Sequence, residues 1–457
     1  MDLGGAPRAT GRNPVLPLQH HVPDPEARVM PDGRLYVYGS YDLAEREYCS
    51  DRYHVASTAD LCEWTVHDVA FRAEDAAWAG PSRPMGRSFL DGAESFDDLP
   101  EHVRSSLPEG TEQMPFEEFA SAVRAAAAER LPKQTLLYAP DAIERDGRYF
   151  LYMCLSDGTE GVAVSDSPEG PFADAVQLPV TGIDPSVFID DDGAAYYYWG
   201  QFESSGARLG PDMMTLDQAS VVDGLLTEGE HHFHEGSSMR KRGDLYYLVY
   251  AEISRGKPTS LGYATSYSPL GPFTYRGVIV DNADCDPESW NNHGSIAEVG
   301  GQWYVFYHRA SRGVSSMRRL CIEPIEFSPD GSIPEVPMTS QGAGEPFAAG
   351  EEIPAFTACG LSGHVRIAPD GHGSEALTEI APGDTAVFRY VDGARAARVS
   401  VQGTGVGSVE VRTSAGSAAV VEVGGGAVEV DLPESFEEIV LVFHEAQKLT
   451  VHSLRFD

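Results

Sequence analysis

Positively charged residues are scarce in this chain of 457 residues: 33 lysines and arginines stand against 70 aspartates and glutamates, a formal net charge of −37. Such a surface repels phosphate backbones and anionic membranes. The composition therefore argues against nucleic acid and membranes as partners, whereas a neutral substrate would meet no repulsion.

Cysteines are few and lack paired spacing: Cys49, Cys62, Cys154, Cys285, Cys321 and Cys359. Without a CxxC pattern we expect reduced, mostly buried thiols and no zinc site. No apolar run approaches the length of a membrane span. The opening MDLGGAPRATGRNPVLPL has neither the apolar core nor the cleavage site of a signal peptide. We therefore expect a cytoplasmic protein.

One short phrase recurs five times along the chain: a strand-like run, a tight turn with glycine, and an aromatic strand. The turn glycines are Gly33, Gly147, Gly193, Gly243 and Gly301. An aromatic residue follows three positions after each, at Tyr36, Phe150, Tyr196, Tyr246 and Tyr304. Repeated small sheets of this period cannot bury both faces alone and must pack around an axis. The repeat predicts an all-β, five-bladed β-propeller.

A polar residue stands six to nine positions before each turn glycine: Asp24, Asp141, Asp184, Glu235 and His293. Because the innermost strand of every blade lines the axis, these side chains should converge at one end of the central channel. A single acid before such a turn is explained by turn stabilisation alone. Five at matching places favour a ring of ionisable groups.

The repeat is interrupted between its first two copies, since Gly33 and Gly147 stand much farther apart than the other turn glycines. We place an insertion at about residues 80–134, between blades one and two. Its segment PFEEFASAVRAAAAERL predicts a helix from a helical apolar spacing at Phe116, Phe119, Val123 and Ala127. A lid, an oligomer contact and a passive elaboration all remain open as its role.

Composition changes after the propeller, which we assign to residues 1–341. Residues 342–457 contain alternating runs such as ARVSVQGTG and EIVLVFHE, which predict a β-sandwich. All five tryptophans precede this region, so it has few aromatic platforms for a sugar. We expect it to brace the propeller.

Converging carboxylates suggest acid–base chemistry. Like charges held close cannot all ionise, so some acquire raised pKa values. One protonated and one ionised carboxyl group, placed on different blades, would suit an inverting glycosidase. A propeller alone implies no enzyme, so a non-catalytic sugar-binding propeller is the rival interpretation.

The blade motifs PDPEARVMPDGRLYVYGSYD, YAPDAIERDGRYFLYM, IDPSVFIDDDGAAYYYWG and HEGSSMRKRGDLYYLVYA resemble those of glycoside hydrolase family 43. The resemblance covers about residues 13–337, apart from the insertion. It implies a five-bladed propeller and an α-L-arabinofuranosidase, β-xylosidase or arabinanase that acts by inversion. The C-terminal region resembles, more weakly, a family 6-like carbohydrate-binding sandwich.

The resemblance also implies residue roles. Asp24 matches the general base, Glu235 the general acid, and Asp141 the third acid that orients the general acid and tunes its pKa. His293 matches a histidine that helps hold a calcium ion or water. A lone histidine is a poor calcium ligand, so contact through water is expected; no cofactor is otherwise required.

The sequence offers further candidates for contact with the sugar. Arg318 matches an arginine that reaches the sugar site, although its neighbour Arg319 leaves the register open. The other candidates are His234, Asp184, Trp199, Asp42 and Trp78. His234 stands beside the expected general acid, Asp184 matches a blade-three acid outside the catalytic three, and the last three have a structural role as the favoured alternative.

We expect an exo-glycosidase that removes terminal α-L-arabinofuranosyl residues from arabinose-containing oligosaccharides. A β-D-xylosidase acting on xylo-oligosaccharides is the alternative, because nothing in the motifs separates the two sugars.

Overall fold

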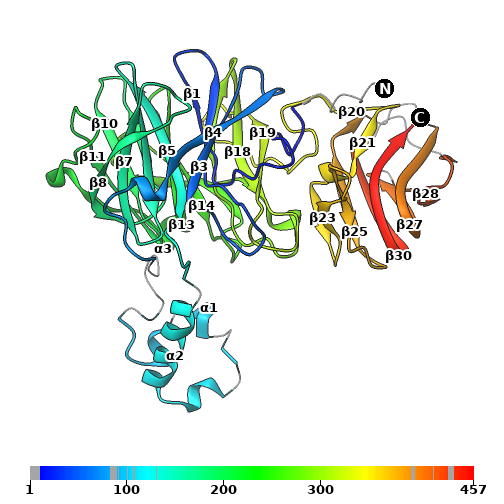
Figure 1. Cartoon of the computed structure of the whole chain (residues 1–457), viewed down its shortest axis with the longest axis horizontal. Helices are drawn as coiled ribbons and strands as arrows, with labels where there is room; N and C mark the ends of the chain where they lie inside the picture. Colours follow the sequence, from blue (N-terminus) through cyan, green and yellow to red (C-terminus); the bar gives the residue numbers. More distant parts are fainter. Residues whose placement is uncertain are drawn as a thin grey trace.

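The computed structural model describes residues 11–82, 90, 92–99, 101–104, 107–108, 110–129, 131–392, 397–414, 416–430 and 437–457. Strands dominate, in a ring of small sheets and a second β region beside it (Figure 1). None of the helices in this described part is long and apolar enough to cross a membrane.

The ring consists of five antiparallel sheets, each following the chain order from the inner strand outward. Blade one contains β1 (Glu26–Val29), β2 (Leu35–Tyr38), β3 (Arg52–Thr58) and β4 (Trp64–Arg72). Blade two contains β5 (Leu137–Arg145), β6 (Arg148–Leu155), β7 (Thr159–Ser165) and β8 (Ala173–Thr181). Blade three contains β9 (Ser186–Ile189), β10 (Ala195–Trp199), β11 (Glu203–Arg208) and β12 (Val222–Thr227). Blade four contains β13 (Phe233–Arg242), β14 (Leu245–Glu252), β15 (Ser260–Ser266) and β16 (Thr274–Asp281), and blade five contains β17 (Ser295–Val299), β18 (Gln302–Arg309) and β19 (Arg319–Ile325).

The inner strands close a complete circle. β1 contacts β5, β5 contacts β9, β9 contacts β13, β13 contacts β17, and β17 returns to β1. A separate hydrophobic core fills each of the five gaps between neighbouring blades. The predicted five-bladed propeller is confirmed.

The repeated turn works as its sequence predicts. Gly33 has φ +82°, a backbone conformation that glycine adopts without strain, and Asp32 Oδ1 accepts a hydrogen bond from the amide of Arg34 at 3.0 Å. The aromatic residues that follow the turns enter the cores between blades, as Tyr36 and Tyr196 show. The same phrase therefore encodes both the hairpin and its packing.

The N-terminal segment seals the ring against blade five. The amide of Asn13 donates to the carbonyl of Ser340 and that of Val15 to the carbonyl of Leu320, both at 3.2 Å. The Asn13 side chain also donates to the Ile322 carbonyl at 2.9 Å. Residues 13–15 thus lie along β19, the last described strand of the blade.

The insertion between β4 and β5 projects from the propeller as a small helical unit (Figure 1). It contains α1 (Glu101–Arg104) and α2 (Phe116–Glu129), so the predicted helix is confirmed. Phe119 is buried with Leu90 and Leu99 in a core of its own. Because it follows an outermost strand and precedes an innermost one, the insertion leaves the propeller at the end where the inner strands begin.

The second β region, residues 347–457, is built around two long antiparallel strands, β27 and β30. Its strands are β20 (Phe347–Ala348), β21 (Glu352–Pro354), β22 (Gly360–Ser362), β23 (Arg366–Pro369), β24 (Glu375–Thr378), β25 (Thr385–Arg389), β26 (Val391–Asp392), β27 (Arg398–Thr413), β28 (Gly416–Glu422), β29 (Val428–Glu429) and β30 (Glu438–Phe456). They enclose a single apolar core rich in valine and leucine. We call these residues the C-terminal β region.

Candidate active site

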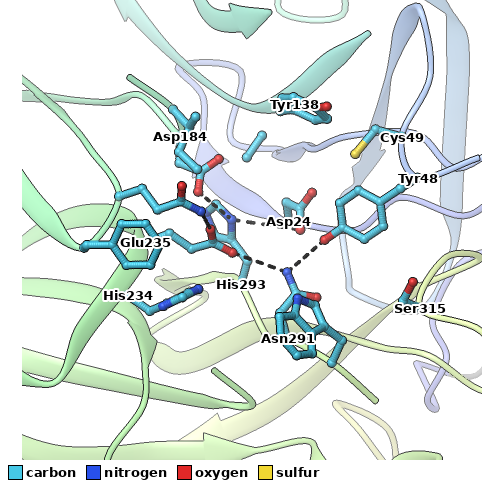
Figure 2. A pocket seen from close by; sticks show the side chains of 15 residues that line it. Asp24, Tyr48, Cys49, Tyr138, Asp184, His234, Glu235, Asn291, His293 and Ser315 are labelled. Carbon is cyan, nitrogen blue, oxygen red and sulfur yellow. Dashed lines mark hydrogen bonds and ion pairs between the residues drawn. The ribbon is translucent and has the colours of Figure 1, made fainter. Parts of the chain in front are cut away.

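A pocket of about 520 Å³ lies at the end of the propeller where the inner strands begin. All five blades contribute to its wall: Asp24, Tyr48, Cys49, Tyr138, Ala139, Ile183, Asp184, Gln201, Phe202, His234, Glu235, Trp290, Asn291, His293 and Ser315. Figure 2 shows the carboxylates of Asp24, Asp184 and Glu235 around His293. The expected convergence of polar residues from different repeats is therefore present, with one exception described below.

Asp24 stands two residues before β1 and is buried. Its Oδ1 accepts a hydrogen bond from Arg318 Nη1 at 2.8 Å, and His308 Nδ1 lies 3.3 Å from the same oxygen. Burial alone would raise the pKa of Asp24, but Arg318, His308 and His293 together outweigh it and hold that pKa well below its usual range. Asp24 is thus ionised across the physiological pH range.

Arg318, and not its neighbour, is the arginine that contacts the pocket residues Asp24 and Tyr48, although its own fully buried side chain does not line the pocket. Its guanidinium also donates to both carboxylate oxygens of Asp42 at 3.0 Å and lies 3.9 Å from the centre of the Tyr48 ring. Arg319 points away and donates to Glu375 in the C-terminal β region. Of the two arginines, Arg318 is therefore the one that binds a pocket carboxylate, and contact of Arg318 with a sugar stays a prediction.

Asp184 stands two residues before β9, as Asp24 does before β1, and both have φ +56°. Nδ1 of His293 lies between them, 3.7 Å from Asp184 Oδ2 and 3.9 Å from Asp24 Oδ1. Burial raises the pKa of Asp184 well above its usual value, and the nearby charges of Glu235 and Asp24 raise it further. Asp184 therefore tends to keep a proton while Asp24 is ionised.

His293 is held tightly above a glycine of blade four. Gly236 has φ +78°, and a Cβ atom there would lie 2.9 Å from His293 Nε2. Burial lowers the pKa of His293, which favours the neutral ring. A neutral ring beside two carboxyl groups can serve as a hydrogen-bond partner without adding a fixed charge.

Glu235 enters the pocket from β13 and is half-buried. Its Oε2 accepts a hydrogen bond from Gln201 Nε2 at 2.7 Å, and its Oε1 lies 3.5 Å from Asn291 Nδ2. The adjacent His234 also lines the pocket, with Nδ1 3.7 Å from Glu228 Oε1 on α3 (Glu228–His231). Burial would lower the pKa of His234, but the acids Glu228 and Glu235 outweigh it and raise that pKa.

Asp141 does not line the pocket, so the expectation that it acts there is wrong. Its carboxylate is bound by Arg28, at 3.1 Å from Nε and 2.5 Å from Nη2, and by the amide of Val187 at 2.7 Å. Arg28 and Arg240 also pair with Glu26. These four charged side chains, which we call the axial cluster, lie on the inner strands beneath the pocket; Glu26, Asp141 and Arg240 are buried and Arg28 is largely so.

Strand register explains the error. Asp141 pairs with Tyr152 in the position where Glu26 pairs with Tyr38 in blade one. In blade three the same position is Ser186, opposite Tyr198. Asp24 and Asp184 stand two residues before this position, a separation of about 6–7 Å along a strand. Asp141 therefore belongs to the layer below, and Ala139 takes the pocket position in blade two.

Three other candidates lie outside the pocket wall. Asp42 accepts hydrogen bonds from Arg318, as described above, and does not line the pocket itself. Trp199 is buried in the core between blades two and three. Trp78 donates from Nε1 to Thr159 Oγ1 at 3.1 Å and packs against Gly161. All three have structural positions, the alternative already favoured by the sequence.

Several pocket residues carried no repeat signal. Tyr48 accepts hydrogen bonds from Arg318 Nη1 and Asn291 Nδ2, both at 2.8 Å. Trp290 is 56% exposed at the pocket, where an indole face can stack on a sugar ring. Its position three residues before His293 was the one available clue, because that places it on the loop entering β17.

The surroundings of His293 do not resemble a direct calcium site. In the described residues, no group of three or more histidine, cysteine, aspartate or glutamate side chains is arranged to hold a metal ion. Calcium prefers six or more oxygen ligands. A calcium ion held through water at His293 stays a prediction.

An ionised carboxylate and a carboxyl group that keeps its proton share this pocket, which is the combination that cleavage of a glycosidic bond requires. The class of protein that this fold and site define is the glycoside hydrolases. Comparison with known proteins then gives the family.

The sequence model of glycosyl hydrolases family 43 matches residues 112–333. A xylosidase/arabinosidase from Thermoclostridium stercorarium is 32% identical over 470 residues, covering 88% of each chain. A β-xylosidase from Xylanibacter ruminicola is 30% identical over 69% of this chain and 97% of its own. The solved structure of a family 43 β-xylosidase/α-arabinofuranosidase from a compost metagenome, in complex with xylotriose, superposes with TM-score 0.54 and 27% identity, covering 73% of this chain and 99% of that one. The chain belongs to glycosyl hydrolases family 43.

Proposed function

We propose that this protein is an inverting exo-glycosidase that removes terminal α-L-arabinofuranosyl residues from arabinose-containing oligosaccharides. The observation that carries the proposal is the charge asymmetry of the pocket. Arg318 holds the pKa of Asp24 low, while burial and the neighbouring acids raise the pKa of Asp184. Hydrolysis by inversion needs a base on one side of the sugar and a proton on the other.

In this mechanism Asp24 is the general base and Glu235 the general acid. Asp24 takes a proton from water as the water oxygen bonds to the anomeric carbon. Glu235 gives its proton to the glycosidic oxygen as the bond to that carbon breaks. One water molecule is consumed, and the released sugar has the inverted configuration.

Asp184 takes the third role, in place of Asp141. It interacts electrostatically with Glu235 and lies on the other side of His293 from Asp24. Burial and the nearby charges of Glu235 and Asp24 raise the pKa of Asp184, so Asp184 retains a proton at a pH where an isolated carboxyl group is ionised. Asp184 thereby helps keep a proton available on the acid side of the pocket.

The residues beneath the pocket support action on a terminal residue. The axial cluster of Glu26, Arg28, Asp141 and Arg240 occupies the inner strands one layer deeper and is largely buried. These paired charges stand beneath the pocket, where a sugar chain would have to continue in order to pass deeper into the propeller. The sugar cleaved would therefore enter end-first, with the rest of the oligosaccharide toward Trp290.

Removal of β-D-xylosyl residues is the second candidate. The names of the relatives support it. One is a xylosidase/arabinosidase, one is a β-xylosidase, and the solved structure is that of a β-xylosidase/α-arabinofuranosidase. The two sugars present similar hydroxyl groups, so one pocket can accept both.

The test is an assay of the purified chain on 4-nitrophenyl α-L-arabinofuranoside and 4-nitrophenyl β-D-xylopyranoside, with Glu235→Gln as the inactive control. Turnover by the parent protein, lost in the control, with the inverted anomer detected first by NMR, is the expected result. A folded protein that hydrolyses neither glycoside, nor any arabino- or xylo-oligosaccharide, contradicts the proposal. Retention of configuration contradicts the roles given to Asp24 and Glu235.

A further inference from the structure

The loop between β18 and β19, residues 310–318, touches both the pocket and the C-terminal β region. Ser315 lines the pocket, and Arg318 at the end of the loop donates to Asp24. At the start of the loop, the carbonyl of Ser311 accepts a hydrogen bond from the amide of Ile367 in β23 at 2.8 Å. One loop thus connects the pocket to the neighbouring β region.

Glu375, the first residue of β24, holds this loop from both ends. Its Oε1 accepts a hydrogen bond from Arg312 Nη2 at 2.6 Å and another from Arg319 Nη2. All three side chains are almost completely buried. Arg312 lies in the loop, and Arg319 directly follows Arg318. The Glu375 carboxylate therefore fixes the position of residues 312–319, the segment that contains Arg318.

The middle of the loop is held in the same way. The amide of Gly313 donates to Asp286 Oδ2 of the propeller at 2.8 Å. On the other side lies Arg366 of β23, whose Nε would be 2.2 Å from a Cβ atom at Gly313. The loop is thus confined between blade five and the C-terminal β region.

We propose that the C-terminal β region is part of the active-site architecture, with Glu375 as a positioning residue that keeps Arg318 on Asp24. Glu375 compensates two buried guanidinium groups at once. If Glu375 lost its charge, the two buried guanidinium groups of Arg312 and Arg319 would lie close together with no carboxylate between them. Uncompensated charge in a buried site lowers the stability of the folded state. The loop would relax, and Arg318 would lose its fixed position. Only the catalytic role of Asp24 in this inference rests on the proposed function.

The first test is independent of any activity. Hydrogen exchange is measured on the peptide covering residues 310–319, which includes the Arg318 amide that donates to Asp42 Oδ2 at 3.0 Å. We expect Glu375→Gln to speed exchange there by about ten-fold or more. The matched control is Glu351→Gln, which removes a different carboxylate paired across the same two regions, with Arg12. Unchanged protection of residues 310–319 in a folded Glu375→Gln protein overturns the proposal.

The second test is kinetic. Glu375→Gln should lower kcat about ten-fold with little change in KM and move the acid limb of the pH–rate profile to higher pH, because Asp24 loses its cation. Glu375→Asp, which keeps the charge, should recover part of kcat, and Glu351→Gln should match the parent. If Glu375→Gln does not fold, Arg312→Gln takes its place, because it removes the bond from the loop to Glu375 and leaves the pair of Arg319 with Glu375 intact. A kcat loss that only follows the folded fraction, with an unchanged pH profile, overturns the proposal.

The two tests also separate this inference from the proposed function. If the parent protein hydrolyses no glycoside, the proposed function fails, while the exchange experiment still decides whether Glu375 positions the loop.

Discussion

Arg318 donates to Asp24 Oδ1 at 2.8 Å, and the arginine side chain is completely buried. An arginine buried this deeply is held by charge, since its guanidinium also pairs with Asp42. The ion pair sets the state of the proposed base and at the same time joins blade five to blade one.

Replacement of Arg318 by glutamine should therefore change both pH dependence and stability. Asp24 would lose the cation that outweighs its burial, so its pKa should rise and the acid limb of kcat/KM should move to higher pH. The buried carboxylates left behind should cost about 3–5 kcal/mol of unfolding free energy, measured by urea denaturation.

The sign of the pH effect follows from the lowered pKa of Asp24. The pair contributes stability above the unfolded pKa of 3.8 and loses it as the pH falls toward the folded value. The stability difference between parent and variant should be largest near neutral pH and shrink in acid. Arg34→Gln, which removes a partly buried arginine of blade one that donates to Ser57, is the control. A difference that grows in acid would refute the role of the pair.

Asp184 and Asp141 should respond in opposite ways to the same substitution. Asp184→Asn should lower kcat by about 100-fold or more with a normal melting temperature, because it removes a pocket acid. Asp141→Asn should cost about 3 kcal/mol of stability, because it leaves Arg28 with only Glu26, which also pairs with Arg240. Kinetics and calorimetry on the pair check both; a stable, inactive Asp141→Asn protein would restore Asp141 to the catalytic machinery.

Trp290→Ala should raise KM for oligosaccharides about ten-fold, equivalent to about 1.4 kcal/mol of lost stacking, with a smaller effect on kcat. Its exposed indole at the pocket is the reason. Tyr267→Ala is the control, because Tyr267 is 80% exposed and lies outside the pocket wall. Equal effects of the two substitutions would argue against a subsite at Trp290.

Glu160→Gln should stabilise the protein increasingly as the pH rises from about 4.5 to about 8. Burial raises the pKa of Glu160 to about 8 from 4.5, although the Tyr197 hydroxyl donates to it. Stability from the protonated group is complete below 4.5 and is lost at about 1.4 kcal/mol per pH unit between 4.5 and about 8. Melting temperatures at pH 5 and 8 test this, with the exposed Glu298→Gln as control. An equal change at both pH values would contradict the raised pKa.

The propeller could be predicted because each blade contains the same local sequence signals for a hairpin and for its packing. An Asp-Gly turn such as Asp32-Gly33 specifies a hairpin locally, and the aromatic residue three positions later specifies where it packs. Closure of the ring by Asn13 could not be predicted, because its partners lie far away in the sequence and the contact uses no repeated motif.

The site was predictable only to the accuracy of strand register. Asp24 and Asp184 stand nine residues before their turn glycines, whereas Asp141 stands six before Gly147. Because of that difference, Asp141 lies in the axial cluster beneath the pocket and not in the pocket wall. Only the observed pairing of Asp141 with Tyr152 reveals this position. Tyr48 and Asn291 lie on loops without a repeat, so their contribution could not be recognised.

The bond from Asn13 to Ile322 spans 309 positions of the chain. During synthesis at 5–20 residues per second, roughly 15 to 60 s separate the appearance of these two residues from the ribosome. Throughout that interval the apolar side of blade one, with Val15 and Leu35, has no blade five to cover it. The nascent chain therefore passes through an open ring with an uncovered apolar edge, the stage at which a chaperone would bind it or another chain would pair with it.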